Sequence, residues 1–154
     1  MRNIALFLFV TVFIFSCSSD DDNNEIETLD PIVGKWFFGN TVYKLTSGGD
    51  YIESISSCEA QTYYKFNANG TAEIMSYYDN STECTLEESD LSQFTWVKVS
   101  ANIYQLYSVE NDGTESTRNE SVYFETPETM YWVDVFNGQI EGNDFNERWS
   151  YFNK

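Results

Sequence analysis

Cysteine is the residue type whose chemistry is most informative in this sequence. The chain contains three cysteines, Cys17, Cys58 and Cys84, and no histidine among its 154 residues. Without histidine there is no imidazole to activate a serine or cysteine nucleophile, to ligate zinc or to carry protons near neutral pH. We therefore expect the thiols to serve covalent attachment or disulfide formation, and we expect the protein not to be an enzyme.

Cys17 follows a segment that is typical of an export signal. Residues 4–15 form an apolar run of twelve positions that only Thr11 interrupts. A helix needs about 20 apolar residues to cross a bilayer, so this run indicates a signal peptide instead of a membrane span. Residues 14–17, Ile-Phe-Ser-Cys, resemble the lipobox of bacterial lipoproteins, which implies cleavage after Ser16 and lipid attachment to the Cys17 sulfur. An ordinary secretory signal with a cysteine near its cleavage site is the alternative.

Residues 18–25 read SSDDDNNE and predict a solvated tether between the lipid and the domain. Acyl chains contribute about 0.8 kcal/mol per buried methylene, which is enough for a firm anchor. The Ser-Asp-Asp-Asp run also resembles acidic signals that carry some bacterial lipoproteins to the outer face of the outer membrane, although a plain tether explains the same residues. We expect a signal peptide at 1–16, a lipidated cysteine and acidic flexible linker at 17–30, and one domain at 31–154. The expected location is the bacterial cell envelope, lipid-anchored to the outer membrane.

The charge of the chain excludes several classes of partner. It carries 25 acidic and 8 basic residues, a formal net charge of −17. Such a charge repels nucleic acid and acidic membrane surfaces, so we expect no nucleic acid partner and membrane contact only through the anchor. Residues 20–22 and 111–115 offer oxygen ligands but lack the spacing of a calcium-binding EF-hand loop. We expect no metal and no cofactor.

From residue 34 onward the sequence is typical of an all-β domain. No long segment has helical spacing, and β-branched and aromatic runs recur between turn residues. The turn and break signals are Asn69-Gly70, residues 100–102, Asp112-Gly113, Pro127 and Asn137-Gly138. Strands are predicted at residues 35–38, 41–45, 62–66, 71–78, 93–99, 103–109, 116–124, 129–136 and 147–152. Consecutive strands joined by short turns predict an antiparallel up-and-down β-barrel of about eight to nine strands, whose last strand pairs with its first.

Cys58 and Cys84 are expected to form a disulfide, because an exported protein folds in an oxidising compartment. If Asn69-Gly70 is a two-residue turn, Ala68 faces Thr71 and Cys58 lies opposite residue 81, within three residues of Cys84. Closing the loop between Cys58 and Cys84 with a disulfide stabilises the domain by about 3.5 kcal/mol in the chain-entropy model.

Several motifs together resemble the lipocalin-like domains of bacterial secreted lipoproteins over residues 31–154. Gly34-Lys35-Trp36 is similar to the Gly-x-Trp signature of the first lipocalin strand. Residues 63–71 after Cys58 are similar to the family's glycine-turn hairpin, and Phe94-Thr95-Trp96 to a later strand, although the family's glycine there is absent. The resemblance implies a lipocalin-like β-barrel with an apolar interior, and an arginine of the last strand, Arg148, covering Trp36.

The aromatic residues of the predicted strands either line a cavity or fill a solid core, and the sequence leaves both open. We expect a non-enzymatic, membrane-anchored binding module for a small apolar or amphipathic ligand. The alternative is a structural or adhesive envelope protein that contacts other proteins through the barrel exterior. The candidate lining residues are Tyr64, Phe66, Phe94, Trp96, Phe124 and Trp132.

Replacing Cys17 with alanine removes the sulfur that the lipid requires. We expect Cys17→Ala protein to appear as a soluble form or an unprocessed precursor, and detergent-phase partitioning with mass spectrometry measures this. Mature Cys17→Ala protein that still enters the detergent phase would contradict the lipoprotein prediction.

Overall fold

The computed structural model describes residues 29–80, 83–87, 93–110 and 112–154. The expected signal peptide, Cys17 and most of the expected linker lie outside these residues. The described part is all-β apart from one short 3-10 helix, η1 (Glu59–Gln61).

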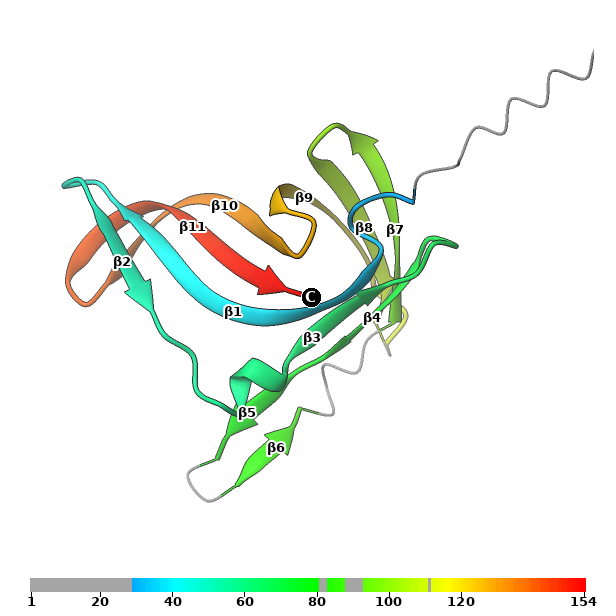
Figure 1. Ribbon diagram of the computed structural model, residues 1–154, viewed down its shortest axis with the longest axis horizontal. Coiled ribbons are helices and arrows are strands. Elements are labelled where there is room, and N and C mark those ends of the chain that lie inside the picture. The colour runs from blue at the N-terminus through cyan, green and yellow to red at the C-terminus, as the bar shows by residue number, and fades with distance from the viewer. Residues whose placement is uncertain (1–28, 81–82, 88–92, 111) are drawn as a thin grey trace, which may run out of the picture.

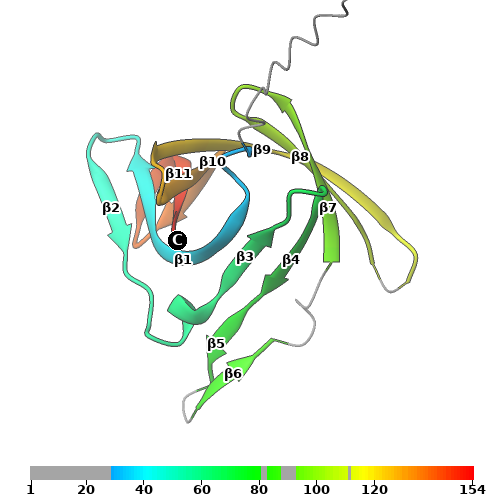
Figure 2. The same ribbon diagram turned by 45° about the vertical axis from the view of Figure 1, so that its right-hand side comes forward.

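Eight antiparallel strands close into a barrel (Figures 1 and 2), which confirms the predicted architecture. Each strand pairs with the next in chain order, and the last pairs with the first. The barrel strands are β1 (Gly34–Leu45), β3 (Tyr63–Phe66), β4 (Thr71–Met75), β7 (Gln93–Ser100), β8 (Ile103–Val109), β9 (Glu115–Thr126), β10 (Thr129–Ile140) and β11 (Asn143–Asn153). A further strand, β2 (Asp50–Glu53), pairs with the second half of β1, and β5 (Tyr77–Asp79) and β6 (Cys84–Leu86) form a separate hairpin.

The first two predicted strands are one continuous strand, β1. Its pairing with β11 shifts register between Phe38 and Thr41, so the chain bulges there without leaving the sheet. On one side, the first half of β1 pairs with β3 and the second half with β2. On the other side, β11 pairs with residues of both halves. The predicted strand at 71–78 is instead divided, because after Met75 the chain leaves the barrel and pairs within the β5–β6 hairpin.

Asn137-Gly138 does not form the predicted turn. Both residues lie within β10, and the chain reverses later, at Glu141 and Gly142, which have positive φ angles of 48° and 77°. A Cβ atom on Gly138 would lie 2.5 Å from a ring carbon of Phe145, so glycine is required here by close packing. Gly138 therefore allows close packing within a strand and does not mark a turn.

The β3–β4 hairpin has a register one residue away from the predicted one. The Asn67 N–H donates to the Thr71 carbonyl at 2.8 Å, and the Gly70 N–H donates back to the Asn67 carbonyl at 3.1 Å. The loop therefore has three residues, with Gly70 at a φ of 80°. This register pairs Tyr64 with Ile74 on the inner face.

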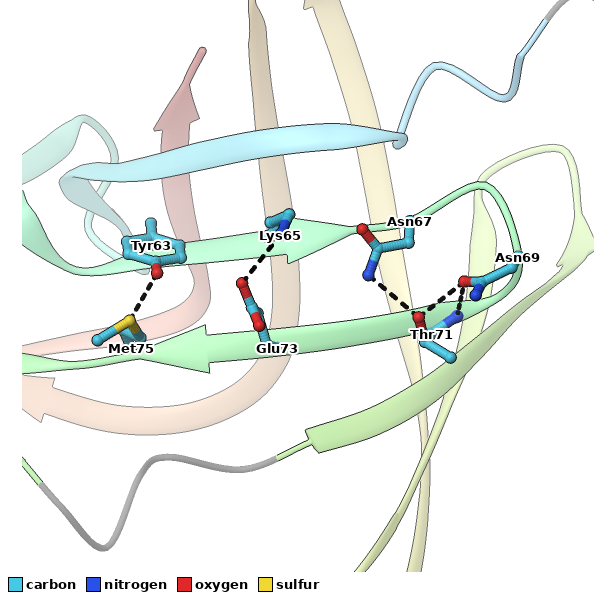
Figure 3. A network of polar contacts seen from close by, with 7 residues as sticks. All are labelled: Tyr63, Lys65, Asn67, Asn69, Thr71, Glu73 and Met75. Atoms are coloured by element: carbon cyan, nitrogen blue, oxygen red, sulfur yellow. Dashed lines mark hydrogen bonds and ion pairs between the residues drawn. The ribbon is translucent and has the colours of Figure 1, made fainter.

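Figure 3 shows the outer face of the same hairpin, where polar cross-strand pairs follow one another. The Lys65 ammonium lies 3.3 Å from a Glu73 carboxylate oxygen, and the Asn67 amide donates to the Thr71 hydroxyl at 3.0 Å. These contacts leave the opposite face of both strands for the barrel interior.

One end of the barrel is closed by the segment before β1 and by the residues it covers. Trp36 is completely buried, and its indole N–H donates to the Ile32 carbonyl at 2.6 Å. The Tyr104 hydroxyl donates to Asp30 at 2.6 Å, and burial raises the pKa of Tyr104, which keeps the hydroxyl protonated. This end is therefore sealed by both apolar packing and hydrogen bonds.

The prediction that Arg148 covers Trp36 is wrong. The β1–β11 register pairs Phe37 with Asn153 and places Arg148 opposite Tyr43, several residues further along β1. The side chain over the Trp36 ring is Lys154, whose ammonium lies 4.4 Å from the ring centroid.

The Cys58–Cys84 disulfide is confirmed. It joins the residue before η1 to the first residue of β6, and Cys58 is buried. The bond thus ties the outlying β5–β6 hairpin to the chain that enters β3.

Barrel closure predicts a large cost for truncating Phe152, a β11 residue that is 2% exposed and packs against Phe38, Tyr64 and Trp132. We expect Phe152→Ala to lower the free energy of unfolding by about 3–5 kcal/mol in urea denaturation. The control is Asn146→Ala, at an exposed position of the same strand. A loss below about 1 kcal/mol for Phe152→Ala would contradict the structure.

Candidate functional site

The barrel interior changes from apolar to charged along its length. Towards the closed end the inward residues form a packed cluster that includes Trp36, Phe66 and Tyr104. Side chains two residues apart on a strand share a face, so Val122 places Glu120 and Arg118 on the inner side of β9. Trp132 places Asp134 on the inner side of β10 in the same way.

Four charged residues, which we name the lumen tetrad, lie in the barrel interior on the side away from the closed end. They are Arg118, Glu120, Asp134 and Arg148. The Arg118 Nε atom lies 2.7 Å from a Glu120 carboxylate oxygen. Arg148 lies opposite Asp134 in the β10–β11 register, and its Nε and Nη2 atoms donate to Asp134 Oδ2 at 3.1 and 2.7 Å. The tetrad therefore consists of two ion pairs carried by three neighbouring strands.

Glu120 is the buried member of the tetrad. Burial raises the pKa of its carboxyl group above the ordinary value, because the ionised form loses hydration. Arg118 and Arg148 lower that pKa, whereas the carboxylate of Asp134 raises it, and the net shift is upward. The negative charge of ionised Glu120 is thus only partly offset by the two arginines.

Two adjoining pockets lie beside the tetrad. The first, of about 360 Å³, is lined by Tyr64, Ile74, Phe94, Leu106, Ser108, Glu110, Ser116 and Arg118. The second, of about 280 Å³, is lined by Phe38, Thr62, Tyr64, Ile74, Ser76, Trp132, Ser150 and Phe152 together with all four tetrad residues. Tyr64, Ile74 and Arg118 line both, so the two pockets share a wall.

Aromatic rings form the apolar part of the second pocket. The Trp132 ring centroid lies 4.7 Å from that of Tyr64 and 5.0 Å from that of Phe152. The Trp132 indole N–H is buried and has no hydrogen-bond partner within the part of the chain that the structure describes. Since a buried donor without a partner is costly, this wall of the pocket has a polar group that is left unsatisfied.

The predicted lining residues divide into two groups. Tyr64, Phe94 and Trp132 line the two pockets. The other three, Phe66, Trp96 and Phe124, pack in or against the core cluster and line neither of these pockets. The interior is thus filled at the closed end and hollow beside the tetrad.

Sequence reasoning missed the lumen tetrad, apart from the misplaced role of Arg148. The available signal was the spacing of Arg118 by four and Glu120 by two residues from the apolar Val122, and of Asp134 by two from Trp132.

Gly34, the predicted signature glycine, lies at the closed end, where a Cβ atom would come within 3.0 Å of Lys154 Cε.

A second feature lies on the outer face of β9, β10 and β11. The rings of Tyr123, Tyr131 and Trp149 stack in a row, with centroids 5.3 and 4.9 Å apart and interplanar angles of 16° and 9°. We name this row the outer ladder. The Lys44 ammonium covers the Trp149 ring at 4.0 Å. Because the rings face one another at the strand spacing, they present edges to solvent and not a flat aromatic surface.

Residues 29–80, 83–87, 93–110 and 112–154 contain neither a metal-binding cluster nor a helix that could span a membrane. No three histidine, cysteine, aspartate or glutamate side chains come together there in a way that would hold a metal ion. Over the same residues, no helix has the length and apolar character needed to cross a membrane.

Comparison with protein-family models, with curated proteins and with solved structures gives no match.

The raised pKa of Glu120 predicts a pH dependence of stability. Its folded-state pKa lies above the unfolded value, so its favourable contribution is present at low pH and is lost as pH rises from about 4.5 through the folded pKa. We therefore expect Glu120→Gln to gain stability relative to wild type between about pH 4 and pH 7 in urea denaturation.

Glu128→Gln, an exposed position on the β9–β10 turn, is the matched control and should show no such gain. A stability difference between wild type and Glu120→Gln that is the same at both pH values would contradict the burial of Glu120.

Proposed function

We propose that this protein is a non-enzymatic binding module of the bacterial cell envelope that holds a small apolar or amphipathic molecule inside its barrel. The observation that carries the proposal is the pair of adjoining pockets within the closed barrel, of about 360 and 280 Å³. Ligand pockets in proteins occupy roughly 300–1,000 Å³ and combine apolar walls with a few polar groups. The two pockets are close to that size, and each combines apolar side chains with polar and charged groups.

The two kinds of wall have separate roles in this proposal. The rings of Tyr64, Trp132 and Phe152 contact the apolar body of the ligand. The charged groups of the lumen tetrad contact its polar end and so fix its orientation.

The proposal includes membership of the lipocalin-like lipoproteins, which the sequence motifs resemble. The closed barrel and the burial of Trp36 beneath a terminal cation, Lys154, support this placement. Attachment through Cys17 would tether the domain to the outer membrane.

Catalysis is the less favoured use of the same pocket. Glu120 and Asp134 are two carboxylates in one cavity, which is also the composition of a glycosidase site. However, they lie on neighbouring strands of one wall, and each forms an ion pair with an arginine. A glycosidase places its two carboxylates on either side of the scissile bond, so the arrangement favours binding.

A structural or adhesive role through the barrel exterior is the second candidate. The observation that favours it is the outer ladder, together with the exposed apolar residues Val97, Val99 and Val135. The stacked rings bury their faces against one another, which accounts for the ladder as a cross-strand stabilising feature without a partner.

Native mass spectrometry of the full-length chain, purified from envelopes in a mild detergent, tests the proposal. We expect a bound small molecule in the wild type and its loss in Ser150→Phe, because Ser150 lines the second pocket and a phenyl ring would fill it. Ser121→Phe is the matched control, since Ser121 is on the face of β9 opposite the buried Val122.

Both variants are checked for folding by circular dichroism. Repeated wild-type preparations without a bound molecule, or equal retention of the molecule by Ser150→Phe, would overturn the proposed function.

A further inference from the structure

We propose that the ligand is a small organic cation, an amine on an apolar or aromatic body, whose charged end contacts Glu120 and Asp134 in the second pocket. This inference rests on the proposed binding function and specifies the chemical class of its ligand.

The first argument is the uneven burial of the lumen tetrad. The side chains of the acids are 9% exposed for Glu120 and 35% for Asp134, whereas those of the arginines are 56% exposed for Arg118 and 41% for Arg148. Water screens the arginine charges more strongly than the carboxylate charges. The inner part of the tetrad is therefore more negative than its formal charge of zero, and it favours a cation.

The second argument is the charge of the surroundings. Three acids, Glu110, Glu120 and Asp134, line the two pockets against two arginines, Arg118 and Arg148. The whole chain carries a net charge of −17. A field of this sign draws cations toward the barrel and repels anions of the same size.

The third argument is the aromatic wall next to the acids. Tyr64 and Trp132 line the pocket that contains Glu120 and Asp134, so an ammonium group bound there lies near ring faces as well as carboxylates. An amine with an apolar body matches both the carboxylates and the aromatic wall of this pocket.

Isothermal titration calorimetry of the full-length chain with three probes that share a phenethyl group tests the inference. The probes are phenethylamine, 2-phenylethanol and 3-phenylpropionate, which are cationic, neutral and anionic at neutral pH. We expect phenethylamine to bind at least about tenfold more tightly than the other two, with an affinity that falls as salt is added.

Variants locate the charge recognition. We expect Glu120→Gln to weaken phenethylamine binding by about tenfold and to leave 2-phenylethanol binding unchanged, because only the charged contact is lost. Asp134→Asn is the second variant, in case Glu120→Gln alters the fold. Glu128→Gln, which removes an acid outside both pockets, is the matched control and should bind phenethylamine as the wild type does.

Tightest binding of 3-phenylpropionate, or equal phenethylamine affinity in the wild type, Glu120→Gln and Asp134→Asn, would overturn the inference. If the chain retains a neutral or anionic molecule in native mass spectrometry and does not bind phenethylamine, the inference fails while the proposed function stands. A chain that retains no molecule and binds none of the three probes contradicts both.

Discussion

The pairing of β1 with β11 is the constraint on which the rest of this structure depends. Strand β1 bonds to β11 along most of its length, and on its other side it bonds first to β3 and then to β2. Without the β1–β11 pairing, two strands rich in aromatic residues would have unpaired edges, which invite aggregation. The pairing also places Lys154 over Trp36, so closing the barrel and sealing one of its ends are the same event.

The same register creates the charged half of the interior. It carries Phe152, Ser150 and Arg148 along the inner side of β11, and the β10 register then sets Arg148 against Asp134. A buried carboxylate such as Glu120 is costly unless it is paired. The packed aromatic cluster at the closed end supplies the stability that allows a hollow, charged region beside it. The proposed binding region is therefore less tightly packed than the closed end of the barrel.

The sequence predicted the features that depend on local pattern or on covalent chemistry: the all-β barrel, the pairing of first and last strands, and the Cys58–Cys84 bond. Features that depend on exact register were missed. A three-residue loop shifted the β3–β4 hairpin by one position, and the β1–β11 register, which pairs Phe37 with Asn153, leaves Arg148 several residues away from Trp36. Charged residues within strands are usually outward, so the inward positions of Glu120 and Asp134 required the assembled barrel to be recognised.

The central claim is that the ligand site lies inside the barrel and not on the outer ladder. Its most direct test is the two-dimensional NMR spectrum of the indole N–H groups during titration with phenethylamine, because the four tryptophans occupy distinct places. Trp132 lines the second pocket, Trp149 belongs to the outer ladder, and Trp36 is sealed in the closed end. We expect a saturable shift of the Trp132 signal while the Trp149 signal stays in place. A saturable shift of Trp149 with an unmoved Trp132 would contradict it.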